Sequence, residues 1–294
     1  MLIIIKNLCA LHIAYIGLIL ISFASLAETQ IFIRDDVLDN YQKFVANRDV
    51  LTIENFNSES IRRDVVDMVL VQQALALGGF KDKFHYIPGR VNFRNTRLLE
   101  QGRLLLSFDS YWLSDAKIIS DVVYTSDAVI RKGEYHAGIF ASPDHPHIFT
   151  LNKINDFSRY TAVSTPRWRT DWATLESLPL KALIREDEWV SQANMVSKML
   201  VDFIMMPFNS DGDPYYQLET ISLKHVPNIA LLLNDSRHFV VSKKHPDGSR
   251  AFIALNKGLA KLRAGSKIIK AYSEAGFLID TDSFLVLNQA NSDG

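Results

Sequence analysis

The sequence predicts an α/β fold, and three observations lead to this prediction. Short segments rich in β-branched and aromatic residues alternate with longer segments of helical periodicity along most of the chain. A continuous run from Leu104 to Phe108 has strand length and is typical of a strand buried on both faces of a parallel sheet. The chain has 294 residues, 48% of them hydrophobic, which is enough for one large domain or two lobes.

The first 27 residues have the order of a targeting segment. Lys6 is the only charge before an apolar run from Leu8 to Phe23, and Ser25-Leu26-Ala27 fits a small-residue cleavage site. We therefore expect a cleaved signal peptide over residues 1–27 and a mature protein that begins at Glu28. The run is also long enough for an uncleaved membrane anchor, but His12 inside it and the cleavage motif favour the signal peptide.

Composition excludes several classes of function. Basic and acidic residues nearly cancel, 32 against 33, so no nucleic-acid-binding surface is indicated. Cys9 is the only cysteine and lies in the targeting segment, which excludes disulfides and thiol chemistry from the mature chain and suits a periplasmic protein. No Gly-rich phosphate loop is present, and the histidines of 144–147 lack a third ligand nearby, so we expect no cofactor and no metal.

In the first half of the mature chain, strand and helix signals follow one another regularly. Cap residues at 57–60 precede a helix whose valines and leucines lie on one face, and Gly78-Gly79 ends that helix. The expected strands are residues 30–33, 50–53, 84–87 and 104–108, and the expected helices are residues 37–45, 61–77 and 96–101.

The second half continues the alternation. Thr165-Pro166 predicts a helix start, because proline is favoured in the first helical turn. The expected strands here are residues 134–141, 159–163, 180–184, 201–206 and 229–233, and the expected helices begin after Pro166 and extend over 189–200.

The stretch from Arg237 to Phe277 combines a strand, a turn and two helices. Phe239 and Val241 alternate with less apolar residues, which predicts a strand over 237–243, and the turn follows at 244–248. Two helices are expected over 249–262 and 267–275, separated by Ala264-Gly265-Ser266 and closed by Gly276 as a C-cap.

This ending, with its Tyr-x₃-Gly-Phe motif at 272–277, resembles the end of bacterial extracellular solute-binding proteins of family 3. The segment from Arg97 to Leu104, where a glycine separates a helix from a buried run, is similar to the same family. The resemblance implies the two-lobed type II periplasmic binding protein fold, with crossover strands at 134–141 and 237–243 as the hinge. It implies one lobe from residues 28–140 plus 238–294 and a second lobe from residues 141–237.

The resemblance also implies a function. It indicates a monomeric, non-enzymatic protein that holds a small polar solute between its lobes for uptake by an inner-membrane ABC transporter, and the arginines at 167 and 169 indicate that this solute is anionic. One alternative keeps the fold but makes the chain the ligand sensor of a signalling partner. Another is a dehydratase-like enzyme on the same fold, for which Asp109 and Glu134 are the available carboxylates, although neither lies in a catalytic motif.

Candidate ligand-binding residues follow from the rule that ligands of open α/β sheets lie beyond the carboxyl ends of strands, against helix N-termini. The first group is Asp109, Ser110, Tyr111 and Trp112, directly after the 104–108 run. Their aromatic rings can stack on a ligand while the hydroxyl and carboxylate groups bind it. The alternative is a surface loop whose Trp112 packs into the lobe.

The second group is Thr165, Arg167 and Trp168, at the expected helix start. A guanidinium beside free backbone N–H groups suits a carboxylate or phosphate. Arg167 and Arg169 are two positions apart and therefore point to different sides, with Arg167 nearer the helix start. The alternative is a pair of solvated arginines.

Two single residues complete the candidates. Phe208 follows the 201–206 strand, where the alternative is a simple turn. Ser126 keeps the serine of the Phe-Ser-x-Pro segment that the family resemblance implies, without its proline. The tandem Arg62-Arg63 lies on an expected helix, and we expect both side chains to be solvated.

The chain also departs from the amino-acid binders that it resembles. Those proteins place an arginine shortly before the Phe-Ser segment, where this chain has Ile118 and Ile119. They place an acid after the strand that corresponds to 201–206, where this chain has Pro207 and Phe208. Because both charged contacts are missing at those positions, the sequence predicts that the solute is not a simple α-amino acid.

Overall fold

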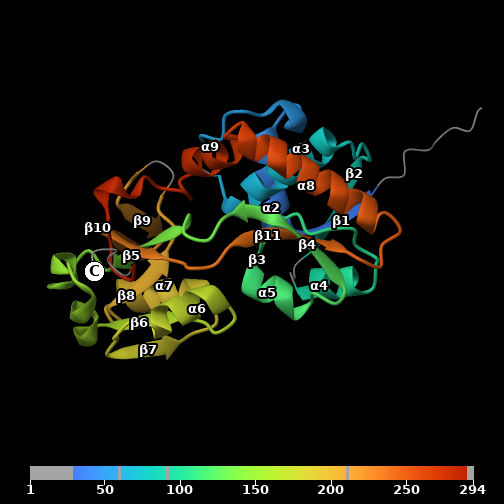
Figure 1. Ribbon diagram of the computed structural model, residues 1–294. Helices are drawn as coiled ribbons and strands as arrows, with labels where there is room; N and C mark the ends of the chain where they lie inside the picture. The colour runs from blue at the N-terminus through green and yellow to red at the C-terminus, as the bar shows by residue number, and fades with distance from the viewer. Residues whose placement is uncertain (1–28, 59–60, 90–92, 210–211, 290–294) are drawn as a thin grey trace, which may run out of the picture.

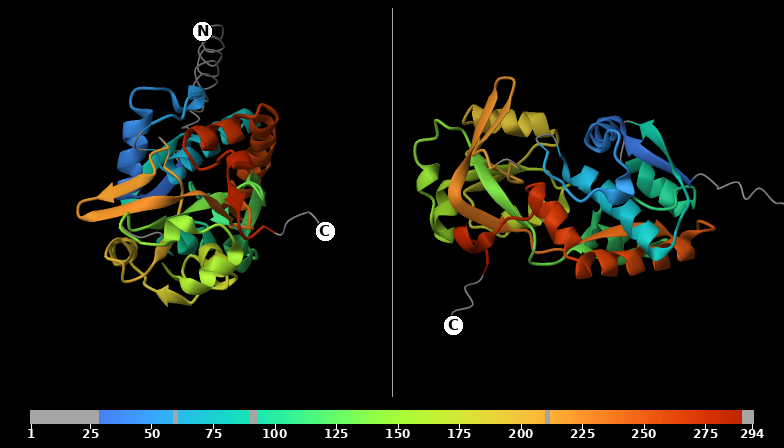
Figure 2. Two further views of the ribbon diagram at one scale, coloured as in Figure 1. Left: turned by 90° about the vertical axis from the view of Figure 1, so that its left-hand side faces the viewer. Right: turned by 90° about the horizontal axis from the view of Figure 1, so that it is seen from above.

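The computed structural model describes residues 29–58, 61–89, 93–209 and 212–289. The chain forms two parts that lie side by side (Figures 1 and 2), one built on a large sheet and the other on smaller sheets covered by helices. Within these described residues, no helix has the length and apolar character needed to span a membrane.

The larger sheet has seven strands in the order β12-β10-β5-β8-β6-β7, with β9 paired to β10. Its strand β6 is parallel to β7 and β8, whereas β5 runs antiparallel to both β8 and β10. Helices α6 (Arg169–Glu176) and α7 (Trp189–Ser197) follow β6 and β7, so the strand–helix alternation places them against this sheet. The strands are β5 (His136–Ala141), β6 (Thr161–Ser164), β7 (Ala182–Arg185), β8 (Phe203–Met206), β9 (Tyr215–Leu218), β10 (Ile221–Leu232) and β12 (Leu285–Val286).

The other part contains a three-stranded sheet, β3-β11-β4, and a two-stranded parallel sheet of β1 and β2. Helix α3 is buried along most of its length and forms the centre of this part. The strands are β1 (Thr29–Arg34), β2 (Phe84–Gly89), β3 (Tyr111–Trp112), β4 (Val123–Ile130) and β11 (Arg237–Ser242). The helices are α2 (Asp35–Val45), α3 (Arg63–Gly78), α4 (Phe93–Glu100), α5 (Leu113–Ile118), α8 (Gly248–Ala264) and α9 (Lys267–Glu274).

Helices α3 and α8 pack with their backbones in close approach. A Cβ at Gly78 would lie 1.8 Å from the carbonyl oxygen of Ala254, and a Cβ at Gly258 would lie 1.7 Å from that of Ala74. Both glycines therefore serve packing, because no larger side chain fits between the helices without moving the backbone. This contact fixes the C-terminal helices against the centre of the part that contains β11.

Two expected strands are absent from the described structure. Residues Val50–Thr52 form a 3₁₀ turn, closed by Asp49, whose carboxylate accepts the N–H of Leu51, so this side chain replaces strand pairing. The 104–108 run is buried but contributes only an isolated antiparallel bridge between Leu106 and Val241. At this bridge the N–H of Val240 donates to the Ser107 hydroxyl at 3.2 Å. In a regular strand a backbone carbonyl would accept this N–H instead.

The division into two lobes at residues 140 and 237 stays a proposal. The proposed crossover segments form β5 and β11, which belong to different sheets. The end of the chain departs from the proposed division, because β12 pairs with β10 and the Asn288 side chain bonds both backbone groups of Leu232. The last described residues therefore lie on the larger sheet rather than beside α8.

The α3–α8 contact gives a direct prediction. Gly258→Ala should lower the free energy of unfolding by about 1–3 kcal/mol, because the new methyl group must separate two backbones. Gly265→Ala is the control: this residue ends α8 with a φ of −84°, and its added Cβ would lie 3.6 Å from the nearest atom. Urea unfolding that gives equal and small changes for both variants would contradict the close approach.

Candidate functional site

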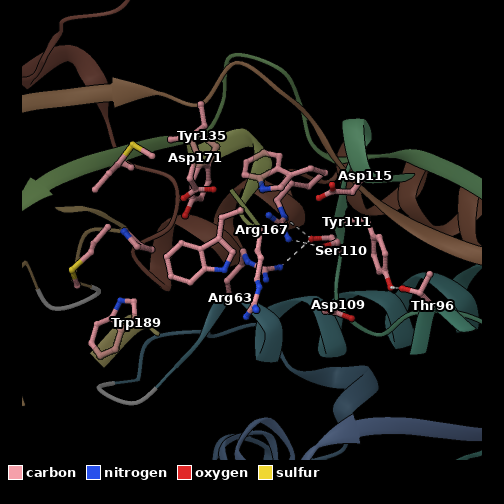
Figure 3. A pocket seen from close by; sticks show the side chains of 18 residues that line it. Arg63, Thr96, Asp109, Ser110, Tyr111, Asp115, Tyr135, Arg167, Asp171 and Trp189 are labelled. Carbon is pink, nitrogen blue, oxygen red and sulfur yellow. Dashed lines mark hydrogen bonds between the residues drawn. The ribbon is translucent and has the colours of Figure 1, made fainter. Parts of the chain in front are cut away.

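A cavity of about 530 Å³ lies between the two parts of the molecule. Figure 3 shows Arg63 and Ser110 near its centre, with Asp109 and Tyr111 toward one side and Trp189 on the other. Its walls contain charged groups of both signs and five aromatic side chains. The lining residues are Arg63, Thr96, Asp109, Ser110, Tyr111, Trp112, Asp115, Tyr135, Ala137, Arg167, Trp168, Asp171, Trp189, Met205, Met206, Pro207, Leu233 and Arg237.

The structure brings six of the nine sequence-predicted residues together at this cavity. They are the four residues from Asp109 to Trp112 and the pair Arg167 and Trp168. The first four come from the part that contains β11, and the pair comes from the larger sheet. Two segments that are distant in the sequence therefore face each other, although the 104–108 run that precedes the first of them is not a strand.

Three predicted residues lie outside the cavity lining, each because the protein uses it elsewhere. The Ser126 hydroxyl accepts the N–H of Phe239 at 3.0 Å and so joins β4 to β11. The Thr165 hydroxyl donates to Asp187 at 2.7 Å and accepts the N–H of Arg167, which holds the turn before α6. Phe208 packs against the rings of His225 and Phe284.

The structure adds two arginines, Arg63 and Arg237, that the sequence analysis does not place in the binding site. Arg63 begins α3 and Arg237 begins β11. Their side chains are only 23% and 8% exposed, so the expectation that Arg63 is solvated is wrong. Arg237 also stacks on Trp112, with its guanidinium carbon 4.4 Å from the ring centroid.

Both guanidiniums are fixed by one hydroxyl, that of Ser110. It accepts an N–H of Arg237 at 2.9 Å and one of Arg63 at 3.2 Å, and it donates to a carboxylate oxygen of Asp67 at 2.8 Å. The same oxygen of Asp67 accepts the backbone N–H of Ser110 and an N–H of Arg63. The Ser110 hydroxyl thereby uses its donor and both acceptor positions.

The guanidiniums keep N–H groups for a ligand. Within the described residues, no acceptor is bonded to Nε or Nη2 of Arg63 or to Nη1 of Arg237. Burial, and after it the charge of Arg63, lowers the pKa of Arg237 to about 10, so this side chain stays protonated at neutral pH. Burial also acts to lower the pKa of Arg63, but the carboxylates of Asp67, Asp64 and Asp109 outweigh it and raise that pKa.

Three carboxylates line the same cavity. Burial raises the pKa of Asp109 and of Asp115 above the ordinary value. It also raises the pKa of Asp171 to about 6, against the opposing charge of Arg237. Asp171 lies in the first turn of α6. A carboxylate of the protein itself is therefore present at the N-terminal end of this helix, where the sequence predicts that an anionic group of the solute binds.

Arg167 and Arg169 lie on different sides of the turn before α6. Arg167 lines the cavity but is 68% exposed at its side chain and lies 3.4 Å from Asp187. Arg169 lines a separate groove of about 780 Å³ between α5 and α6, and its Nε is 3.4 Å from Asp115. Helix α6 begins at Arg169 rather than directly after Pro166, so Arg167 belongs to a turn and not to the helix.

The walls differ in character between the two parts. The charged groups Arg63, Asp109 and Arg237 come from the part that contains β11. The larger sheet contributes mainly apolar side chains: Ala137, Trp168, Trp189, Met205, Met206, Pro207 and Leu233. The cavity therefore offers a charged floor and an apolar wall. Among the described residues, no group of histidine, cysteine and acidic side chains could hold a metal ion.

Comparison with known proteins identifies the fold. Neither a protein family nor a curated protein matches the sequence. The structure is similar to the periplasmic VFT2 domain of BvgS from Bordetella pertussis, with a TM-score of 0.54 and 14% identity over 71% of this chain and 83% of that domain. It is also similar to ytmK, the probable amino-acid ABC transporter extracellular-binding protein of Bacillus subtilis. That TM-score is 0.52, with 15% identity over 74% of this chain and 88% of the other.

These similarities define the class of fold. The chain has the mixed α/β fold of two-lobed periplasmic binding proteins, as its sequence predicts. At 14% and 15% identity the similarity concerns the fold, so the residues of the cavity have to be interpreted from their own geometry.

Asp171 yields a pH-dependent prediction. Its pKa is higher in the folded chain than the ordinary 3.8, so the folded state holds the proton more tightly and this group's contribution to stability falls as pH rises from about 4 to above 6. Asp171→Asn should therefore raise the free energy of unfolding by about 1–3 kcal/mol at pH 7.5 and by about 1 kcal/mol or less at pH 4.5.

Urea unfolding at the two pH values measures this difference. Asp121→Asn, at an exposed position, is the control and should show no such pH-dependent gain. A gain for Asp171→Asn that is equal at both pH values would mean that burial of the charge is not its cause.

Proposed function

We propose that the chain is a solute-binding protein that holds a small polar solute, bearing an anionic group, between its two lobes. The observation that carries this proposal is the cavity between the two parts, where the buried guanidinium of Arg237 and the partly buried one of Arg63 keep unused N–H groups. The paired N–H groups of a guanidinium match the two oxygens of a carboxylate. Burying both groups in one site makes binding selective for a solute that carries a carboxylate. The likeness in fold to periplasmic binding proteins supports the same role.

The cavity supports a particular orientation of the solute. A carboxylate would accept N–H groups from Arg63 and Arg237, and the apolar body of the solute would contact Trp168, Trp189 and Met205 on the larger sheet. This arrangement favours Arg63 and Arg237 over Arg167 as the place for the anion, because the Arg167 side chain is far more exposed than either.

The expectation that the solute is not an α-amino acid needs revision. It depended on two missing charged contacts at 117–119 and 207–208. Arg63 and Arg237 supply a positive site from other elements, and the Asp109 and Asp171 carboxylates supply acceptors for an ammonium group. Since both charge signs are available, amino acids belong among the solutes to be tested.

The partner and the location follow from the same proposal. Delivery of the solute to an inner-membrane ABC transporter is the first candidate, and presentation to a signalling partner is the alternative. The dehydratase-like alternative depends on the carboxylates of Asp109 and Glu134. Glu134 pairs with Arg263 at 3.1 Å and does not line the cavity, so only Asp109 of these two lies there. We therefore propose a periplasmic binding protein without catalytic activity.

A solute screen tests the proposal. We expect at least one compound among the twenty standard amino acids, benzoate, succinate and other small carboxylates to bind in calorimetry. Arg237→Gln should then weaken binding at least about 30-fold, because removing one partner of a buried, hydrogen-bonded charge pair costs about 2–5 kcal/mol.

Arg159→Gln is the matched control, since this arginine is 59% exposed, pairs with Asp156 and does not line the cavity. Its loss should change affinity by about 1 kcal/mol or less. If both variants bind as tightly as the original chain, the solute is recognised elsewhere and the proposed site is wrong.

The location rests on the targeting segment and has its own test. N-terminal sequencing of the protein from a periplasmic fraction should begin at Glu28, because the cleavage motif ends at Ala27. Recovery of the chain in the membrane fraction with Met1 in place would refute cleavage.

A further inference from the structure

The Tyr-x₃-Gly-Phe motif near the end of the chain connects to the cavity. Tyr272 lies on α9 and is fully buried. Its hydroxyl donates to Oδ1 of Asp67, a residue on α3 that is 205 positions earlier in the sequence. Burial, and then the charge of Asp67, raises the pKa of Tyr272, so the phenol keeps its proton and acts as a donor.

The other oxygen of Asp67 leads to the arginines. Oδ2 accepts both the backbone N–H and the hydroxyl of Ser110, each at 2.8 Å. Ser110 in turn accepts N–H groups of Arg237 and Arg63. A continuous series of hydrogen bonds therefore extends from the C-terminal helix to the charged floor of the cavity.

We infer that Tyr272 is a positioning residue for solute binding: it orients Asp67, and through Ser110 it fixes the two guanidiniums that receive the anionic group. Tyr272 does not line the cavity, so it acts only through these intermediates. The inference rests on the proposed function for its consequence in binding, but the orientation of the arginines can be measured without any solute.

The physical reason is that Asp67 is a carboxylate with no exposed surface. Its two oxygens need donors on both sides, because a buried charge without partners is strongly unfavourable. Without the phenol, Oδ1 loses its donor, and the carboxylate gains by turning toward other groups or toward water. Either movement removes the acceptor that holds Ser110 and Arg63.

The chain offers a matched control in Tyr41 on α2. Tyr41 is also buried in the part that contains β11, and its hydroxyl accepts an N–H of Gln72 at 2.9 Å and lies 3.3 Å from the hydroxyl of Tyr86. None of these three residues lines the cavity. Tyr41→Phe therefore deletes the same atom from the same half of the molecule without touching the series of bonds to the arginines.

The experiment compares Tyr272→Phe with Tyr41→Phe. Phenylglyoxal, which modifies arginine, is used as the probe, and peptide mass spectrometry follows modification of each site. We expect Arg63 and Arg237 to react about three-fold faster or more in Tyr272→Phe and at an unchanged rate in Tyr41→Phe. Only Tyr272→Phe removes a hydrogen bond from the series that holds the two guanidiniums in place. The exposed Arg159 serves as the internal standard in each sample.

Binding provides the second measurement. For a compound that binds the original chain, Tyr272→Phe should raise Kd about five-fold or more, whereas Tyr41→Phe should leave it within about two-fold. Urea unfolding of both variants separates this effect from stability, since both lose a buried hydrogen bond. If Tyr272→Phe does not fold, Ser110→Ala interrupts the same series at its other end and should accelerate the reaction of both arginines.

The outcomes are distinguishable. Equal labelling rates in the two tyrosine variants, or unchanged rates in Ser110→Ala, would overturn the positioning role. Faster labelling in Tyr272→Phe together with no binding of any carboxylate or amino acid to the original chain would support the positioning role and refute the proposed function.

Discussion

The buried carboxylate of Asp67 is the constraint on which the rest of the site depends. A fully buried charge is tolerated only when donors surround it, and here they come from α3 itself, from the loop before β3 and from α9. Satisfying Asp67 therefore requires three segments, far apart in the sequence, to meet at one point. The close packing of α3 and α8 through Gly78 and Gly258 brings the C-terminal helices to that point.

The same constraint explains the chemistry of the cavity. The guanidiniums of Arg63 and Arg237 meet the carboxylates of Asp67 and Asp109 at the floor, and Asp171 approaches from the larger sheet, so both charge signs are present there. A solute carboxylate at the floor would accept the N–H groups that both guanidiniums keep, and such a charge pair becomes stronger when the solute displaces water from the site. The side of the cavity on the larger sheet then decides which solutes fit, because it contributes mainly apolar contact, with Arg167 and Asp171 as its charged groups.

Sequence reasoning predicted the fold and part of the site, and its limits have a physical cause. The α/β alternation and the loop from Asp109 to Trp112 follow from local patterns and from a rule about strand ends. Asp67 and Tyr272, by contrast, are brought together by packing across 205 positions, which no local pattern encodes. The sequence shows Arg63 only as one of two arginines on an expected helix, and its contact with Ser110, 47 positions away, follows from packing that the local pattern does not contain. The family resemblance indicates Ser126 and the expected helix start indicates Thr165, but the fold uses their hydroxyls to join β4 to β11 and to hold a turn.

A crystal structure of the protein purified from its native cells, without refolding, tests the central claim most directly. The account predicts density for one small molecule between the two lobes, with a carboxylate or similar anionic group within hydrogen-bond distance of both Arg63 and Arg237. Density for a solute in the groove between α5 and α6, or in the cavity but away from both guanidiniums, would contradict it.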